Sequence, residues 1–175
     1  LNNAGENSRL LILETAKKTY RNKINRANSN RKLCVYTLGN SQNNPFRINP
    51  FFFEPGSNIK QHIAVLADAI ADLLPMEALI GPKLREAVEN CYKNCGWDIE
   101  TGICSGTICY PDMLSFNSEV NKICQSLKDY GPEVRSNYRG ALLNRSRIFI
   151  DDVYQDIFAY DGNKTIDQLF PPDTD

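Results

Sequence analysis

Apolar residues form two short runs near the start of the chain. Leu10–Leu13 is a run of four aliphatic side chains that ends at Glu14, and residues 32–38 (KLCVYTL) are rich in β-branched and aromatic side chains. An unbroken aliphatic run of this length is typical of a strand covered on both faces of an α/β sheet, and it is too short for a buried helix. The pattern therefore predicts strands near residues 10–14 and 32–38.

Four later segments show the apolar spacing of three or four residues that is typical of amphipathic helices. The first lies between residues 57 and 74 and stops at Pro75, and the second begins at Gly81-Pro82 and ends at Gly96. The third lies within residues 112–128, and the fourth opens at Pro132-Glu133. The positions expected to be buried are, in order, Ile59, Ile63, Leu66, Ile70, Leu73 and Leu74; Leu84, Ala87, Val88, Cys91, Tyr92 and Cys95; Met113, Phe116, Val120, Ile123, Cys124 and Leu127; and Val134, Tyr138, Ala141 and Leu142.

The remaining segments complete the expected organisation. Residues 43–55 (NNPFRINPFFFEP) hold three prolines, which exclude a helix and indicate an extended loop that packs on the core through its aromatic side chains. Asp161-Gly162 is a tight-turn dipeptide between Ile157–Tyr160 and Thr165–Phe170. This order predicts a partial sheet in residues 1–56, a helical part in residues 57–150 and a return segment in residues 151–175.

Composition and charge are those of an ordinary globular protein, with 42% hydrophobic and 23% charged residues. The net charge of −1 gives no general attraction to nucleic acid or to a membrane surface. No apolar run approaches the roughly 20 residues that span a bilayer, and no signal peptide opens the chain, so we expect a cytoplasmic protein without a membrane partner. Within the polar residues 1–8, Gly5 lies where a helix C-cap is expected. We therefore expect that the sequence starts inside a larger domain.

Four of the six cysteines fall close together in the sequence. Cys91, Cys95, Cys104 and Cys109 could bind zinc, but the gaps between them differ from the C-x2-C pairs that shape zinc ribbons. Cys91 and Cys95 also lie on the apolar face of the second expected helix. Reduced, partly buried thiols that pack as small hydrophobic groups are therefore the favoured interpretation, with a metal site as the alternative.

Few other residues suggest chemistry. His62 is the sole histidine and lies beside the apolar stripe of the first helix, so we interpret it as structural. Arg135 and Arg139 are one turn apart on the fourth helix, where they form either a solvated face or a contact for an anion or nucleic acid. The phosphate-binding pattern G-x-x-x-x-G-K-[ST] is absent, as are G-x-G-x-x-G, G-x-S-x-G and H-E-x-x-H.

Several blocks of sequence together resemble one family. Residues 4–21, which include LLILETAKKTYR, are similar to the second-strand region of HerA-type ATPases, the HerA/FtsK branch of P-loop motors, with Thr15 where that family often has proline. Residues 35–51 (VYTLGN, then PFRINPF) resemble the family's next strand and the loop after it. Residues 131–139 (GPEVRSNYR) resemble a later helix of its helical insertion, and Thr165–Phe170 resembles the segment before the Walker B strand.

The resemblance implies the central part of a motor domain that lacks the Walker A and Walker B motifs. The implied fold is α/β and predominantly helical: a partial RecA-like parallel sheet of two or three strands, with a helical insertion of about four helices. The implied function is that of a fragment of an ATP-driven DNA translocase or helicase, which would use ATP and Mg²⁺ in the intact parent protein. Its implied partners are DNA, further copies of the protein in a ring that is expected to be a hexamer, and a nuclease or effector.

Two residues follow from the resemblance as candidates near the nucleotide. Glu14 and Lys17 would lie at the edge of the sheet where ligands bind, with Glu14 in an accessory role near the γ-phosphate or the attacking water. No complete catalytic set is present, so this chain alone is expected to be inactive and to need no cofactor. The alternatives are a non-catalytic helical interaction module and a zinc-stabilised binding domain that uses the cysteine cluster.

Overall fold

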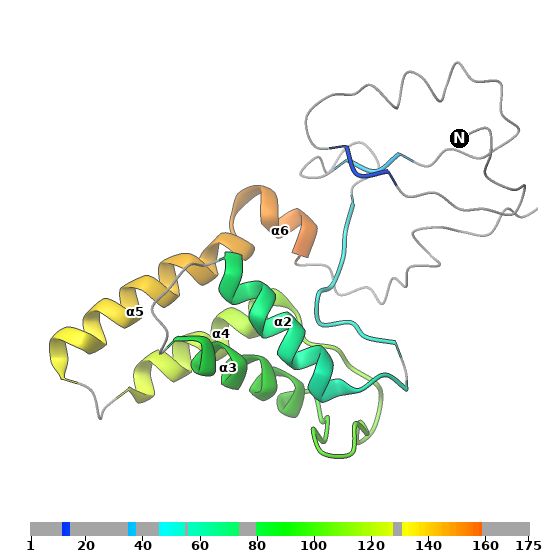
Figure 1. Cartoon of the computed structure of the whole chain (residues 1–175), viewed down its shortest axis with the longest axis horizontal. Helices are drawn as coiled ribbons and strands as arrows, with labels where there is room; N and C mark the ends of the chain where they lie inside the picture. Colours follow the sequence, from blue (N-terminus) through cyan, green and yellow to red (C-terminus); the bar gives the residue numbers. More distant parts are fainter. Residues whose placement is uncertain are drawn as a thin grey trace, which may run out of the picture. The chain divides into compact units, whose positions relative to one another are not determined.

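A computed structural model of the chain describes residues 12–14, 35–37, 46–54, 56–73, 80–127 and 131–158 (Figure 1). The chain divides into two compact units. One consists of Leu1–Tyr36 with Lys164–Asp175, and the other, which we call the helical unit, is Thr37–Asn163. Nearly all of the described residues belong to the helical unit, so the fold is described there.

The helical unit contains the helices that the apolar spacing predicts. These are α2 (Ile59–Leu73), α3 (Ile80–Asn94), α4 (Met113–Ser126) and α5 (Pro132–Ser146), followed by the 3₁₀ turn η1 (Arg147–Phe149) and the short helix α6 (Asp152–Phe158). In chain order, α2 packs on α3, α3 on α4 and α4 on α5 (Figure 1). The prediction of four amphipathic helices in this part of the chain is confirmed.

Local sequence signals explain where these helices begin and end. The side chain of Asn58 accepts a hydrogen bond from the Gln61 amide at the start of α2 (3.2 Å), and Asp112 accepts one from the Ser115 amide at the start of α4 (2.7 Å). Such N-caps satisfy amide groups that have no partner within the helix. At the end of α3, Gly96 has a φ of 86°, a left-handed conformation that glycine adopts without strain.

The prediction of a parallel sheet is wrong for the described residues, which contain no strand and no sheet. Of the first expected strand, residues 12–14 are irregular, and Leu13 is 80% exposed. Of the second, residues 35–37 are described and form no strand. The prediction assumed that other elements cover both faces of this aliphatic run. Leu13 is largely exposed, so this assumption does not hold. Leu10 and Leu11 lie outside the described residues.

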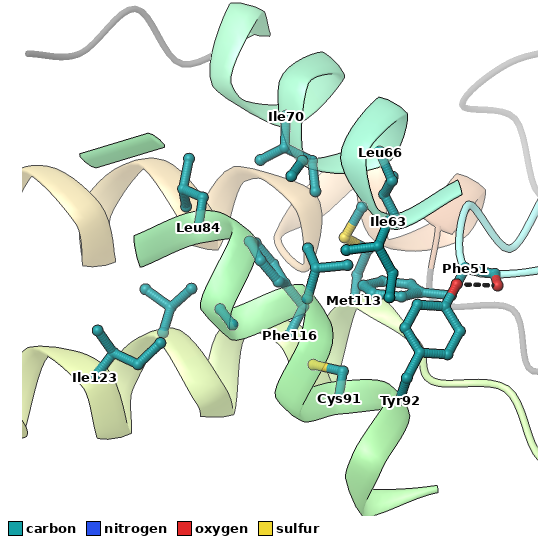
Figure 2. Close-up of a cluster of buried hydrophobic side chains, with 14 of the residues drawn as sticks. Phe51, Ile63, Leu66, Ile70, Leu84, Cys91, Tyr92, Met113, Phe116 and Ile123 are labelled. Atoms are coloured by element: carbon teal, nitrogen blue, oxygen red, sulfur yellow. Dashed lines mark hydrogen bonds between the residues drawn. The ribbon is translucent and has the colours of Figure 1, made fainter. Parts of the chain in front are cut away.

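The core of the helical unit lies between α2, α3 and α4. Figure 2 shows Ile63, Leu66 and Ile70 of α2 facing Leu84, Cys91 and Tyr92 of α3, with Met113, Phe116 and Ile123 contributed by α4. Phe51, which precedes α2, enters the same cluster and is completely buried. Because burying a large apolar side chain contributes about 1.5–3 kcal/mol, this cluster supplies most of the stabilisation that the short helices need.

Two details differ from the sequence prediction. Leu73 is 66% exposed, because the buried stripe of α2 ends at Ile70, and Ala67 is buried in its place. Ile157 and Phe158 belong to α6 rather than to an arm of a tight turn, and the Asp161-Gly162 turn lies outside the described residues. Of the positions expected to be buried in α5, Leu142 is buried. The side chains of Val134, Tyr138 and Ala141 lie outside the description.

Within the described ranges, none of the helices is both long enough and apolar enough to cross a bilayer.

Candidate functional site

The segment Phe46–Glu54 is built into the core of the helical unit. The Asn49 side chain is buried; its amide donates a hydrogen bond to the Pro111 carbonyl before α4 (2.7 Å), and its carbonyl oxygen accepts one from the Phe51 amide (3.0 Å). The Ile48 amide donates to the Ile157 carbonyl of α6 (3.0 Å). One short segment thus contacts both the start of α4 and the end of the helical unit.

The two buried phenylalanines of this segment lie against helix α3. The hydroxyl of Tyr92 donates a hydrogen bond to the Phe51 carbonyl (Figure 2), and the two rings are 5.8 Å apart between centroids. Phe53 lies 5.0 Å from the Trp97 ring and 5.5 Å from the Tyr110 ring. The sequence predicts that these aromatic side chains pack on the core, and this is confirmed; the polar anchoring by Asn49 was not foreseen.

His62 sits between aromatic rings, as its position beside the apolar stripe suggests. Its ring centroid is 5.4 Å from that of Phe53 and 6.3 Å from that of Tyr92. Burial lowers the pKa of His62, and a hydrogen bond to the Pro50 backbone only partly opposes that effect. The imidazole thus lies among aromatic rings with its buried Nε2 atom unpaired, which fits the structural interpretation.

Cys91 is buried, unlike the other three candidate zinc ligands, Cys95, Cys104 and Cys109. It points into the core between α3 and α4 (Figure 2), where burial and the nearby charge of Glu119 raise its pKa from 9.0 to about 12. Cys95, Cys104 and Cys109 lie at the end of α3 and in the connector between α3 and α4. The part of the chain that the structure describes contains no group of three or more His, Cys, Asp or Glu side chains that could hold a metal ion.

A surface pocket of about 480 Å³ lies between α2, α3 and the connector. Its lining residues are Lys60, Arg85, Glu89, Lys93, Trp97, Asp98, Ile99 and Glu100. Lys60 pairs with Glu100 (2.6 Å), and Glu89 pairs with both Arg85 (3.4 Å) and Lys93 (3.9 Å). A hydrogen bond from the Glu100 amide lowers the pKa of Asp98. The lining holds three basic and three acidic side chains.

This balance does not fit a nucleotide phosphate. A phosphate site needs a surplus of positive charge or a nest of free backbone amides. The pocket offers cations that are already paired with carboxylates, and the sequence has no glycine-rich phosphate loop. We therefore derive no step of ATP chemistry from these residues.

The residues predicted near the nucleotide or near DNA are only partly described. Glu14 is exposed and belongs to the first unit, whereas Lys17 lies outside the described residues. Arg135 and Arg139 are both on α5, one turn apart as predicted; Arg139 is exposed, and the Arg135 side chain is outside the description. Whether they contact nucleic acid stays a prediction.

Comparisons of the chain with protein-family models, with curated proteins and with solved structures find no match.

Proposed function

We propose that this chain is a non-catalytic, largely helical part of an ATP-driven DNA translocase or helicase of the HerA type. In the assembled motor, ATP and Mg²⁺ would be bound by residues other than those of the helical unit. DNA and further copies of the protein in a ring would be its partners in the cytoplasm, with a nuclease or effector as a further candidate. The polypeptide alone is expected not to hydrolyse ATP, because a motor needs a phosphate loop with its lysine and a magnesium-binding side chain.

The observation that carries the proposal is the structural role of the PFRINPF block. This block is among the most specific parts of the family resemblance, and three of its residues have roles that depend on their identity. Asn49 needs both an amide donor and a carbonyl acceptor for its two hydrogen bonds, Pro50 lies in the turn, and Phe51 fills the core. A sequence block with such specific structural roles supports common ancestry better than a chance likeness in an exposed loop does.

The proposal is tested by ATP hydrolysis in the presence and absence of double-stranded DNA. The chain itself should show no magnesium-dependent turnover, and the polypeptide encoded with its flanking sequence should show DNA-stimulated turnover. Robust hydrolysis by the chain alone, or none by the longer polypeptide, contradicts the proposal.

Glu14 provides a sharper version of this experiment. In the longer polypeptide, Glu14→Gln should lower turnover about tenfold or more, the effect expected for a polar group that assists the attacking water. The matched control is Glu100→Gln, which removes the charge of another exposed carboxylate at a surface ion pair and should leave turnover unchanged. If Glu14→Gln and Glu100→Gln have the same turnover, Glu14 does not assist hydrolysis, and the rest of the proposal is unaffected.

One observation favours a helical interaction module as the second candidate. Ile103 and Ile108 in the connector are 67% and 55% exposed, and Leu114 at the start of α4 is also exposed. Exposed apolar side chains mark a protein contact where they form a contiguous patch, and this candidate function requires such a patch from these three. A folded chain that neither hydrolyses ATP in its longer form nor binds DNA would favour this candidate.

A further inference from the structure

Two cysteine sulfurs touch at the surface of the helical unit. The Sγ atoms of Cys95 and Cys109 are 3.4 Å apart, and the Cys109 thiol donates a hydrogen bond to the Cys95 sulfur. Both are free thiols in this structure. A disulfide bond measures about 2.0 Å, so the sulfurs would need to approach by roughly 1.4 Å. We propose that Cys95 and Cys109 form a disulfide bond when the reduced protein meets a small-molecule disulfide such as oxidised glutathione.

The backbone on the Cys95 side is fixed by the end of α3. The Gly96 amide donates to the Lys93 carbonyl (3.0 Å) and the Trp97 amide to the Tyr92 carbonyl (3.0 Å). This pair of bonds is the Schellman motif that ends a helix at a left-handed glycine, and it makes Cys95 the last residue before the turn. The position of Cys95 is thus determined by the helix and not by a mobile loop.

The Cys109 side is held by the buried tryptophan. Trp97 is 7% exposed, and its indole Nε1 donates to the Cys109 carbonyl (2.6 Å). The next residue, Tyr110, donates from its hydroxyl to the Phe53 carbonyl (3.1 Å). Trp97 also forms a β-bridge with Cys104, which folds the connector back on itself. Hydrogen bonds therefore fix the backbone on both sides of two sulfurs that already lie 3.4 Å apart.

The exposure of the two thiols sets the order of the reaction. Cys109 is exposed and Cys95 is half-buried, so Cys109 reacts first with a disulfide from solution. Its thiolate attacks one sulfur of oxidised glutathione, forms a mixed disulfide and releases one glutathione thiolate. The Cys95 thiolate then attacks the Cys109 sulfur and releases the second glutathione. Overall, two protein thiols are oxidised, one glutathione disulfide is reduced, and the two thiol protons pass to the released glutathione.

Burial raises the pKa of Cys95 to about 12, and the charge of the neighbouring Cys109 contributes to that rise. The contribution of Cys109 ends once its sulfur is in the mixed disulfide. Ring closure should therefore become faster as the pH rises, because the thiolate is the nucleophile.

Cys104 is the natural alternative partner, and its contacts argue against it. Its thiol lies near the Cys95 carbonyl (3.5 Å) and the Thr107 carbonyl (3.8 Å). Cys104 is close enough to Cys95 to raise the pKa of that thiol, but among the described residues its sulfur forms no hydrogen bond to another sulfur. Cys91 and Cys124 are buried in the core. Cys104→Ser is thus a suitable control that keeps the proposed pair intact.

The test equilibrates the full chain with defined ratios of reduced and oxidised glutathione, traps the free thiols by alkylation and maps the linked peptides by mass spectrometry. We expect the Cys95–Cys109 linkage in the wild type and in Cys104→Ser, and its loss in Cys95→Ser and Cys109→Ser. The equilibrium constant for the bond should be at least about tenfold larger in the native protein than in urea, because the fold holds the sulfurs together.

Four outcomes would overturn the proposal. These are a linkage to Cys104, mixed disulfides with glutathione alone, no linkage at all, or an equilibrium constant that is no larger in the native state than in urea. Unchanged far-ultraviolet circular dichroism in each serine variant shows that a lost linkage does not reflect lost folding. None of these results depends on the proposed motor function.

Discussion

The core between α2, α3 and α4 and the connector between α3 and α4 are held together in different ways. The core consists of apolar side chains at helical spacing, joined by Phe51, Phe53 and Trp97 from outside the helices, and its two cysteines, Cys91 and Cys124, are buried. The connector has little regular structure and is held by side chains that bond to its backbone, such as the Trp97 indole. Substitutions in the core should therefore change stability strongly, whereas the connector surface should tolerate change and carry the thiol chemistry.

The largest effect is expected for Phe51→Ala. The side chain is completely buried and packs against Tyr92 and Phe116, so its removal should lower the free energy of unfolding by about 3–5 kcal/mol. Urea unfolding measures the loss. The matched control is Phe52→Ala, because Phe52 is the next residue but is only partly buried; it should cost clearly less. Equal costs for the two variants would mean that Phe51 is not part of the core.

A smaller effect is expected in the pH dependence of stability. The pKa of Cys91 is raised from 9.0 to about 12 by burial and by the charge of Glu119, so the fold favours the neutral thiol. That stability is fully present below pH 9 and is lost as the pH rises toward 12, because the unfolded chain releases the proton first. Between about pH 8 and pH 10, the wild type should lose about 1 kcal/mol more than Cys91→Ala.

Val88→Ala is the control for this measurement. Val88 is equally buried on the same helix but does not titrate, so its replacement should lower stability at every pH and keep the wild-type slope. Parallel pH profiles for Cys91→Ala and the wild type would show that the Cys91 thiol is not held neutral by the fold.

The smallest effect is expected for the ion pair that joins α2 to the connector. Lys60 and Glu100 are 2.6 Å apart, but their side chains are 46% and 79% exposed. Exposed pairs contribute about 0–1 kcal/mol, so Lys60→Ala should change the unfolding midpoint little, and added salt should remove the difference. A loss as large as that of Phe51→Ala would mean that this pair is not a solvent-screened surface interaction.

The contrast between the helical core and the connector also explains how much of the structure the sequence predicts. Helices α2 to α5 follow from apolar spacing, since α2, α3 and α4 each bury one face and Leu142 of α5 is buried. The caps at Asn58 and Asp112 are visible as residue types. The parallel sheet was wrong because an aliphatic run shows only that a segment is apolar. It does not show that partners cover it, and the exposed Leu13 lacks that cover.

The candidate site was less predictable than the helices. The contact between Cys95 and Cys109 depends on the Schellman turn at Gly96 and on the hydrogen bond from Trp97, two contacts that no periodic pattern encodes. The Asn-Pro dipeptide before Phe51 was visible, but the partner of Asn49 is the Pro111 carbonyl, 62 residues away. Long-range polar contacts of this kind leave no local signal, and this limits what a single sequence predicts.

The coding sequence on either side of these codons tests the functional proposal most directly. The proposal predicts a G-x-x-x-x-G-K-[ST] motif shortly upstream and an apolar stretch ending in acidic residues shortly downstream, in the same reading frame. An open reading frame that extends in both directions without either motif would contradict membership in a HerA-type motor, and would leave the helical interaction module as the function to pursue.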